Sequence, residues 1–131
     1  LKKVFLMVGG KAAMALQDRI EDEQEIMMHL ADVMIEIYAA ESAILRTEKL
    51  VGIKGESACE HQIAMSKVYL FEAVDKIEAA AKEAIVSFTK GDEQKVLLMG
   101  LKRYTKPDFI NTKELRRTIA DYMIEQGKYP F

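Results

Sequence analysis

The feature that most constrains the fold is a helical stretch whose apolar residues occupy more than one side. Between residues 20 and 50, one apolar stripe recurs every three or four residues, the spacing of a helix seam in a bundle. A second apolar stripe runs beside the first. Because so wide an apolar surface needs other helices to cover it, we expect this segment to be an interior element. The first stripe comprises Ile26, Leu30, Val33, Ile37, Ala40 and Ile44, and the second Met27, Ala31, Met34, Tyr38 and Leu45.

The same helical spacing extends along the whole sequence. There are two prolines, Pro107 and Pro130, and no stretch alternates apolar and polar residues well enough to predict a strand. We therefore expect an all-α fold: an up-and-down antiparallel bundle of four to five helices, two of them long. The predicted helices cover residues 1–17, 20–50, 57–89, 93–104 and 112–126.

Glycines and capping residues predict the helix boundaries. Gly9-Gly10, within the first segment, predicts either a break or the close approach of another backbone. Gly52 and Gly55 are expected to end the second helix, and Gly127 the last one. The last three helices have candidate N-terminal caps: a capping box of Ser57 and Glu60, then Asp92, then Asn111 with Glu114 or Thr112 alone.

Length and composition fit one domain. A chain of 131 residues has the usual size of a single domain, and half of the residues are apolar. We therefore expect one helical bundle domain over residues 1–131. Because the sequence begins with Leu1 and not with methionine, we expect it to be part of a larger protein.

Charge and cysteine content restrict partners and location. The net charge is −2 with both signs interspersed, which gives no reason to expect nucleic acid as a partner. No apolar run reaches the ~18–20 residues of a membrane span, and Lys11 interrupts the apolar start. We expect neither membrane association nor a signal peptide. The lone Cys59 cannot form an intrachain disulfide, which fits a reducing compartment, and we expect a cytoplasmic location.

The histidines do not have the spacing of a helical-bundle metal site. Such sites use Glu-x-x-His on facing helices, and neither His29 nor His61 has a glutamate three residues before it. Glu25 and His29 can share a helix face, whereas the adjacent Glu60 and His61 point in different directions. We predict no metal ligand; a metal-binding four-helix protein stays an open alternative.

Candidates for catalysis and for cofactor binding also lack partners. Cys59 lies in the first turn of a predicted helix, but Glu56 and Glu60 oppose a thiolate there, so we interpret Cys59 as structural. Gly9-Gly10 lacks the preceding strand and the third glycine of a dinucleotide-binding turn. We assign no catalytic, cofactor-binding or metal-ligating residue. Two carboxylate pairs look like solvated faces: Asp18 with Asp22, and Asp75 with Glu78.

The C-terminal third holds the strongest local charge feature. A phosphate-bearing ligand or an acidic partner could bind its basic cluster, although solvated helix faces explain the cluster more simply. The cluster comprises Lys102, Arg103, Lys106, Lys113, Arg116 and Arg117. Aromatic residues gather in the same third and predict a tail packed onto the bundle; these are Tyr104, Phe109, Tyr122, Tyr129 and Phe131.

The second predicted helix contains a spaced set of residues, E-Q-x5-L-A-D-x2-I-x2-Y-A, which comprises Glu23, Gln24, Leu30, Ala31, Asp32, Ile35, Tyr38 and Ala39. This set resembles the extra C-terminal helical region of the acyl-CoA dehydrogenase family, especially its very-long-chain type and bacterial relatives. Glu72-Ala73 with Ile77 and the terminal Tyr129-Pro130-Phe131 add to the resemblance. The similarity covers most of the chain in the same helix order.

The resemblance implies a parent enzyme that binds FAD and introduces an α,β double bond into acyl-CoA thioesters. In that family a glutamate removes the α-proton while flavin N5 accepts the β-hydride, and both groups belong to upstream domains. FAD is therefore expected in the parent and not in this segment. The resemblance also implies that the segment packs on its own upstream catalytic domains in a homodimer, while the parent uses an acyl-CoA substrate and an electron acceptor.

A free-standing helical protein-interaction module is the alternative interpretation. Such a module would recognise a partner helix or an acidic surface through its basic C-terminal third. A reading frame that continues upstream of Leu1 favours the dehydrogenase, and a start codon just before Leu1 favours the module.

Overall fold

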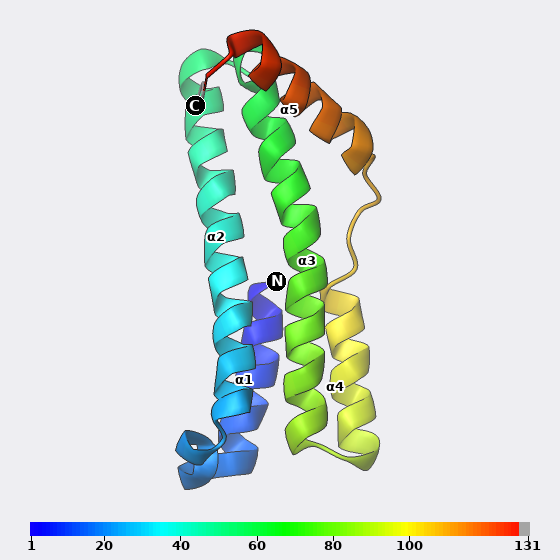
Figure 1. Cartoon of the computed structure of the whole chain (residues 1–131). Helices are drawn as coiled ribbons and strands as arrows, with labels where there is room; N and C mark the ends of the chain where they lie inside the picture. The colour runs from blue at the N-terminus through cyan, green and yellow to red at the C-terminus, as the bar shows by residue number, and fades with distance from the viewer. Residues whose placement is uncertain (129–131) are drawn as a thin grey trace. The chain divides into compact units, whose positions relative to one another are not determined.

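The computed structural model describes residues 1–128, and this part of the chain is helical and contains no strand (Figure 1). The α-helices are α1 (Lys2–Leu16), α2 (Gln24–Lys54), α3 (Glu60–Phe88), α4 (Gly91–Tyr104) and α5 (Thr112–Gln126). Two 3-10 turns, η1 (Gln17–Asp22) and η2 (Ser57–Cys59), precede α2 and α3. The all-α prediction with two long helices is confirmed.

Contacts divide the chain into two units, and both long helices contribute to each unit. The first unit contains residues 1–38 and 73–107. The second unit contains residues 39–72 and the chain from Asp108 onward.

The first unit is a bundle of four helical segments: α1, the N-terminal half of α2, the C-terminal half of α3, and α4. Consecutive segments run in opposite directions (Figure 1). One cluster of buried apolar side chains joins all four segments, and the first apolar stripe of α2 contributes Ile26, Leu30 and Val33 to it. The other members are Val4, Val8, Ala12, Leu16, Ile77, Ala81, Ala84, Ile85, Leu97 and Leu101.

Buried threonines hold the two ends of α4 in this unit. Thr89 lies in the connection before α4; its hydroxyl donates to the Ile85 carbonyl at 2.6 Å, and its carbonyl accepts from Gln94 Nε2 at 2.6 Å. Thr105, which follows α4, is 1% exposed, and its hydroxyl lies 2.8 Å from Glu78 Oε2. Because Glu78 belongs to α3, the Thr105 contact joins the end of α4 to α3.

The second unit has three helical segments: the C-terminal half of α2, the N-terminal half of α3, and α5. Arg116 forms an ion pair with Glu72, and the Tyr122 ring meets the His61 ring edge-on with centroids 3.9 Å apart. Since residues 116 and 122 of α5 meet residues 72 and 61 of α3, α5 runs antiparallel to α3. No residue of α5 is fully buried.

Several predicted helix boundaries are confirmed. The Asn111 side-chain oxygen accepts the Glu114 N–H at 3.3 Å, which caps α5. Gly127 follows α5 with φ of 61°, and Gly55 follows α2 with φ of 85°. Both glycines adopt the left-handed conformation that side chains disfavour.

Two predictions made from glycines are wrong. Gly9-Gly10 lies inside a continuous α1, and a Cβ at Gly9 would meet the Leu30 side chain at 3.8 Å, so there is neither a break nor a close backbone. Gly52 is an internal residue of α2. The propensity cost of ~1 kcal/mol per glycine is small beside the burial of the apolar side of α1, and packing decides the outcome.

Two predicted caps are also wrong. Ser57 is the first residue of the η2 turn, where the Cys59 N–H donates to the Glu56 carbonyl at 3.0 Å, so the capping box is replaced by a 3-10 turn. Asp92 is already within the first turn of α4, which begins at Gly91. Gly91 has φ of 64°. Because α4 begins at Gly91, it starts one residue before the predicted cap, Asp92. The Asp92 carboxylate pairs with Lys95 at 2.9 Å.

Candidate interaction surfaces

The histidines and the cysteine make structural contacts. Cys59 is 1% exposed and lies in η2, two residues before the His61 ring that contacts Tyr122. His29 is half-buried beside Glu36, which forms an ion pair with Lys76 at 2.9 Å. In residues 1–128, no group of three or more histidines, cysteines or carboxylates is arranged to hold a metal ion.

Of the four carboxylates predicted to face solvent, three are exposed and one is partly buried. Asp18, Asp22 and Asp75 are exposed. Glu78 is partly buried, and its carboxylate accepts from the Thr105 hydroxyl. Glu78 therefore has a structural partner and does not face Asp75 as half of an acid–base pair.

The described residues form no glycine-rich dinucleotide-binding turn. A dinucleotide pyrophosphate binds free backbone N–H groups at a glycine-rich turn between a strand and a helix. The described part of the chain has no strand, and Gly9-Gly10 lies in the middle of α1, where the backbone N–H groups are used by the helix.

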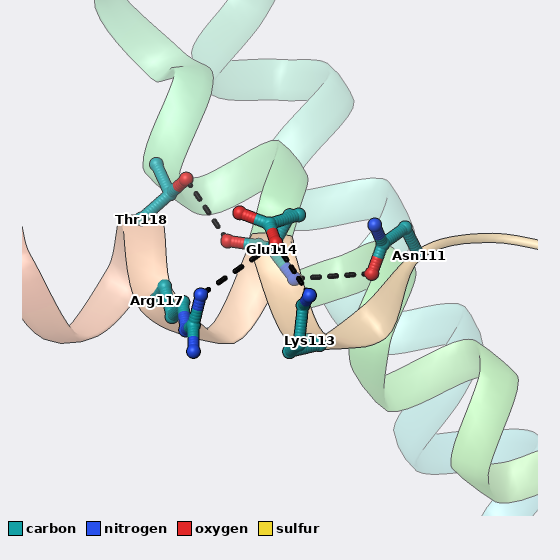
Figure 2. A network of polar contacts seen from close by, with 5 residues as sticks. All are labelled: Asn111, Lys113, Glu114, Arg117 and Thr118. Atoms are coloured by element: carbon teal, nitrogen blue, oxygen red, sulfur yellow. Dashed lines mark hydrogen bonds and ion pairs between the residues drawn. The ribbon is translucent and has the colours of Figure 1, made fainter.

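The basic cluster is divided between the two units. On α5 the positive charges are paired: Glu114 contacts both Lys113 at 3.0 Å and Arg117 at 3.8 Å, while Arg116 pairs with Glu72. Figure 2 shows the Glu114 network together with the Asn111 cap and the Thr118 hydroxyl that donates to the Glu114 carbonyl. These α5 cations are largely neutralised within the chain, which weakens the interpretation of the whole cluster as one binding site.

The C-terminal aromatic residues do not all pack. Tyr122 contacts His61, and Tyr104 lies beneath Lys3 Nζ at 5.9 Å from the ring centroid. Phe109, in the loop before α5, is 95% exposed, so its predicted packing is wrong. Tyr129 and Phe131 lie outside the described residues.

One side of α2 presents apolar side chains to solvent. We call this surface the α2 outer face: Met27, Met28, Ala31, Met34, Ile35 and Tyr38, all in the first unit. Ile35 is 61% exposed and Tyr38 73% exposed. At helical spacing no charged side chain falls between these residues. Monomeric proteins rarely leave a continuous charge-free apolar strip in water, so the α2 outer face is a candidate docking surface.

The exposure of this face corrects a prediction. The second apolar stripe of α2 was expected to be covered by other helices, but Met27, Met34 and Leu45 are 46%, 51% and 57% exposed. The four-segment core of the first unit is completed by the opposite side of α2, where Ile26, Leu30 and Val33 are buried. Within the first unit, the other three helical segments all pack on that inner side of α2.

A second exposed surface lies on α4. We call it the α4 outer face: Val96 and Met99, followed by Lys102 and Arg103 in the last turn of α4 and by Lys106 just beyond it. Val96 is 66% and Met99 72% exposed. Within residues 1–128 none of the three cations forms an ion pair, in contrast to the α5 cations. The α4 outer face therefore has two apolar residues followed by unpaired positive charge at its C-terminal end, while Asp92 and Lys95 pair with each other at its N-terminal end. The sequence contained this signal in the helical spacing of Val96, Met99 and Arg103, but the whole basic cluster obscured it.

An open groove follows α3 in the second unit. We call it the α3 groove. Its apolar surface comes from Ile44 and Val51 of α2 and Ile63 and Leu70 of α3, and its volume is 490 Å³. An adjoining hollow of 480 Å³ shares Ile63 and extends to Leu115 of α5. The sequence did not predict this groove: Ile44 belongs to the first apolar stripe of residues 20–50, which was expected to be covered by other helices.

No helix in residues 1–128 is long and apolar enough to cross a membrane.

Comparisons with known proteins identify relatives. Residues 1–103 match the family described as the acyl-CoA dehydrogenase C-terminal domain. The chain is 34% identical over 128 residues to a probable acyl-CoA dehydrogenase of Bacillus subtilis (strain 168), covering 98% of this chain and 22% of that protein. It also matches the crystal structure of an acyl-CoA dehydrogenase complexed with FAD from Bacillus anthracis, with a TM-score of 0.96 and 35% identity. That match covers 99% of this chain and 22% of the solved one, so the chain spans about a fifth of these relatives.

Proposed function

Because this chain belongs to the acyl-CoA dehydrogenase C-terminal domain family, we propose that residues 1–131 are the C-terminal scaffold domain of a larger FAD-dependent acyl-CoA dehydrogenase. The parent enzyme introduces an α,β double bond into acyl-CoA thioesters and passes the electrons through FAD to an acceptor. The domain itself contributes no catalytic residue. The similarity to longer dehydrogenases over nearly the whole of this chain supports the proposal.

The observation that carries the scaffold role is the α2 outer face. The inner side of α2 already packs in the buried core, so the apolar residues on its outer side add nothing to that core. Burial of apolar surface stabilises association by ~25 cal/mol per Å², so a charge-free strip from Met27 to Tyr38 favours docking. We infer that the α2 outer face packs on the upstream catalytic domains of the same protein.

The proposal includes a homodimeric parent in the cytoplasm. The single cysteine, Cys59, is buried and forms no disulfide, which is consistent with a reducing compartment. The alternative of a free-standing module acting through its basic C-terminal third is less well supported, because the α5 part of that cluster is paired internally.

The docking role is tested by producing this chain and the upstream remainder of the parent as separate polypeptides in one cell. The wild-type chain should co-purify with the remainder. Met34→Lys combined with Ile35→Lys should abolish co-purification and leave the far-ultraviolet circular dichroism of the chain unchanged. Leu6→Lys combined with Met14→Lys is the matched control, because those α1 side chains are 70% and 71% exposed and lie outside the α2 outer face. Undiminished co-purification of the α2 variant would refute the docking role.

The enzymatic role of the parent needs a separate test. The full-length protein should show a flavin absorption spectrum that an acyl-CoA substrate bleaches, whereas the isolated 131-residue chain should neither bind FAD tightly nor turn over acyl-CoA. Tight FAD binding by the isolated chain, or a full-length protein that does not oxidise any acyl-CoA, would contradict the assignment.

A further inference from the structure

The second unit contains one helical segment fewer than the first. In the first unit four segments surround a shared core, whereas the second unit has only the halves of α2 and α3 together with α5 in the described chain. The α3 groove runs along α3, with α2 lining one part and α5 the adjoining hollow. An added helix lying in this groove would cover Ile44, Val51, Ile63 and Leu70. The groove therefore suits a helix, which is a common way for proteins to recognise an amphipathic partner.

The charges around the α3 groove restrict which helix can enter. Glu48, Glu56 and Glu60 line the groove and its adjoining hollow, against a single cation, Lys67. All four side chains belong to exposed residues, and none of the four forms an ion pair in the described structure. The groove thus has an apolar floor and an excess of negative charge at its rim. A basic amphipathic helix is the complementary occupant.

A helix with these properties is present in the chain itself. The α4 outer face places exposed Val96 and Met99 one turn before the unpaired cations Lys102, Arg103 and Lys106. Its lysines and arginine lack ion-pair partners within residues 1–128, as do the glutamates of the groove. Val96 and Met99 would contact the apolar residues of the α3 groove. The three unpaired cations would lie near the three unpaired glutamates, Glu48, Glu56 and Glu60.

We propose that the α3 groove of one copy of this chain receives the α4 outer face of a second copy. The proposal specifies a contact for the homodimer of the proposed function and in that sense rests on it. Each copy carries both surfaces, one in each unit, so every copy offers a groove and an α4 outer face to other copies.

The size of the contact sets its strength. The 14 residues of α4 form a helix ~21 Å long and ~10 Å wide, so two such contacts cover less than the ~800 Å² per partner of a standard interface. The association of the isolated chain is therefore weak, and it weakens further as salt screens the charges.

Charge reversal provides the test. One variant of the 131-residue chain carries Glu48→Lys and Glu56→Lys, and another carries Lys102→Glu and Arg103→Glu. Sedimentation velocity from micromolar to near-millimolar concentration should show self-association of the wild type and a loss of about tenfold or more in each variant. In each variant the groove and the α4 outer face bear the same sign. An equimolar mixture should regain association, because the unchanged α4 face of the first variant meets the unchanged groove of the second, and the two reversed surfaces also match.

The control is Asp18→Lys with Asp22→Lys, a reversal of the same size in the η1 turn, which should leave association unchanged. Circular dichroism verifies that every variant is folded. A wild-type chain that stays monomeric at every concentration would overturn the proposal and leave the groove to the upstream polypeptide. A mixture that associates no better than its components would overturn it too. Neither outcome bears on the flavin spectrum or acyl-CoA oxidation of the full-length protein, which test the proposed function separately.

Discussion

Thr105 illustrates how one buried hydroxyl fixes the end of a helix. Its Oγ1 lies 2.8 Å from Glu78 Oε2 and 2.9 Å from the Leu101 carbonyl, and the residue is 1% exposed. A hydroxyl carries one hydrogen, and a carboxylate is the stronger acceptor, so the bond to Glu78 holds α4 against α3.

Thr105→Val should destabilise the protein by ~1–3 kcal/mol, because the isosteric side chain leaves the partly buried Glu78 carboxylate without its donor. Urea unfolding followed by circular dichroism measures the change. Thr118→Val removes an exposed hydroxyl that bonds only the Glu114 carbonyl of its own helix, and should stay within ~0.5 kcal/mol of wild type. Equal losses of stability for the two substitutions would show that the hydrogen bond from Thr105 to Glu78 does not stabilise the fold.

Substitution by alanine should change the stability of the protein in opposite directions at two glycines, Gly9 and Gly55. Gly9 lies within α1, and an added Cβ would make an ordinary contact with Leu30 at 3.8 Å, so Gly9→Ala should stabilise by ~0.5–1 kcal/mol. Gly55 has φ of 85°, and Gly55→Ala should destabilise by ~1–2 kcal/mol, because alanine is strained there. Thermal unfolding should therefore show a higher Tm for the first variant and a lower Tm for the second. A fall in Tm for Gly9→Ala would mean that α1 needs its glycine.

At the scale of the element, substitutions on the two sides of α2 should differ sharply in their effect on stability, although the residues are neighbours in sequence. Ile26 is 2% exposed and belongs to the core, so Ile26→Ala should cost ~2–5 kcal/mol. Met27 is 46% exposed on the α2 outer face, so Met27→Ala should change the stability of the isolated chain by less than ~1 kcal/mol. Chemical denaturation of the two variants makes the comparison, and a large cost at Met27 would indicate that the outer face is covered within the chain.

The helices themselves could be predicted from sequence, because a 3.6-residue apolar period over two long segments admits no competing structure. The seam of α2 was predicted correctly at Ile26, Leu30 and Val33 for that reason. The second stripe was predicted to be covered, which is wrong for this chain, because periodicity identifies an apolar side but not the polypeptide that covers it. The helix ends at Ser57 and Asp92 were missed because a cap contributes only ~1 kcal/mol, which local packing easily outweighs.

At the scale of the whole molecule, the buried core is distributed very unevenly between the units. The apolar cluster lies entirely in the first unit, where Ile77, Ile85, Val4 and Val8 are fully buried. In the described part of the second unit, the residues buried to the same degree are small: Ala40, Cys59 and Ala64. Since burial of large apolar side chains supplies most of the stability of a domain, the second unit should open more readily than the first.

Hydrogen exchange can test this difference within single continuous helices. Amides of residues 42–54 in α2 and 64–72 in α3 should exchange faster than those of residues 28–38 and 73–88, because the former open with the weakly packed second unit. Raising the protein concentration should slow exchange in the 42–54 and 64–72 segments if a second copy fills the α3 groove, and should leave the first-unit core unchanged. Mass spectrometry of peptic fragments resolves these segments. Equal exchange rates along the whole of α2 and α3 would instead mean that the second unit is as stable as the first. In that case the amides around the α3 groove would be protected without a second copy bound there.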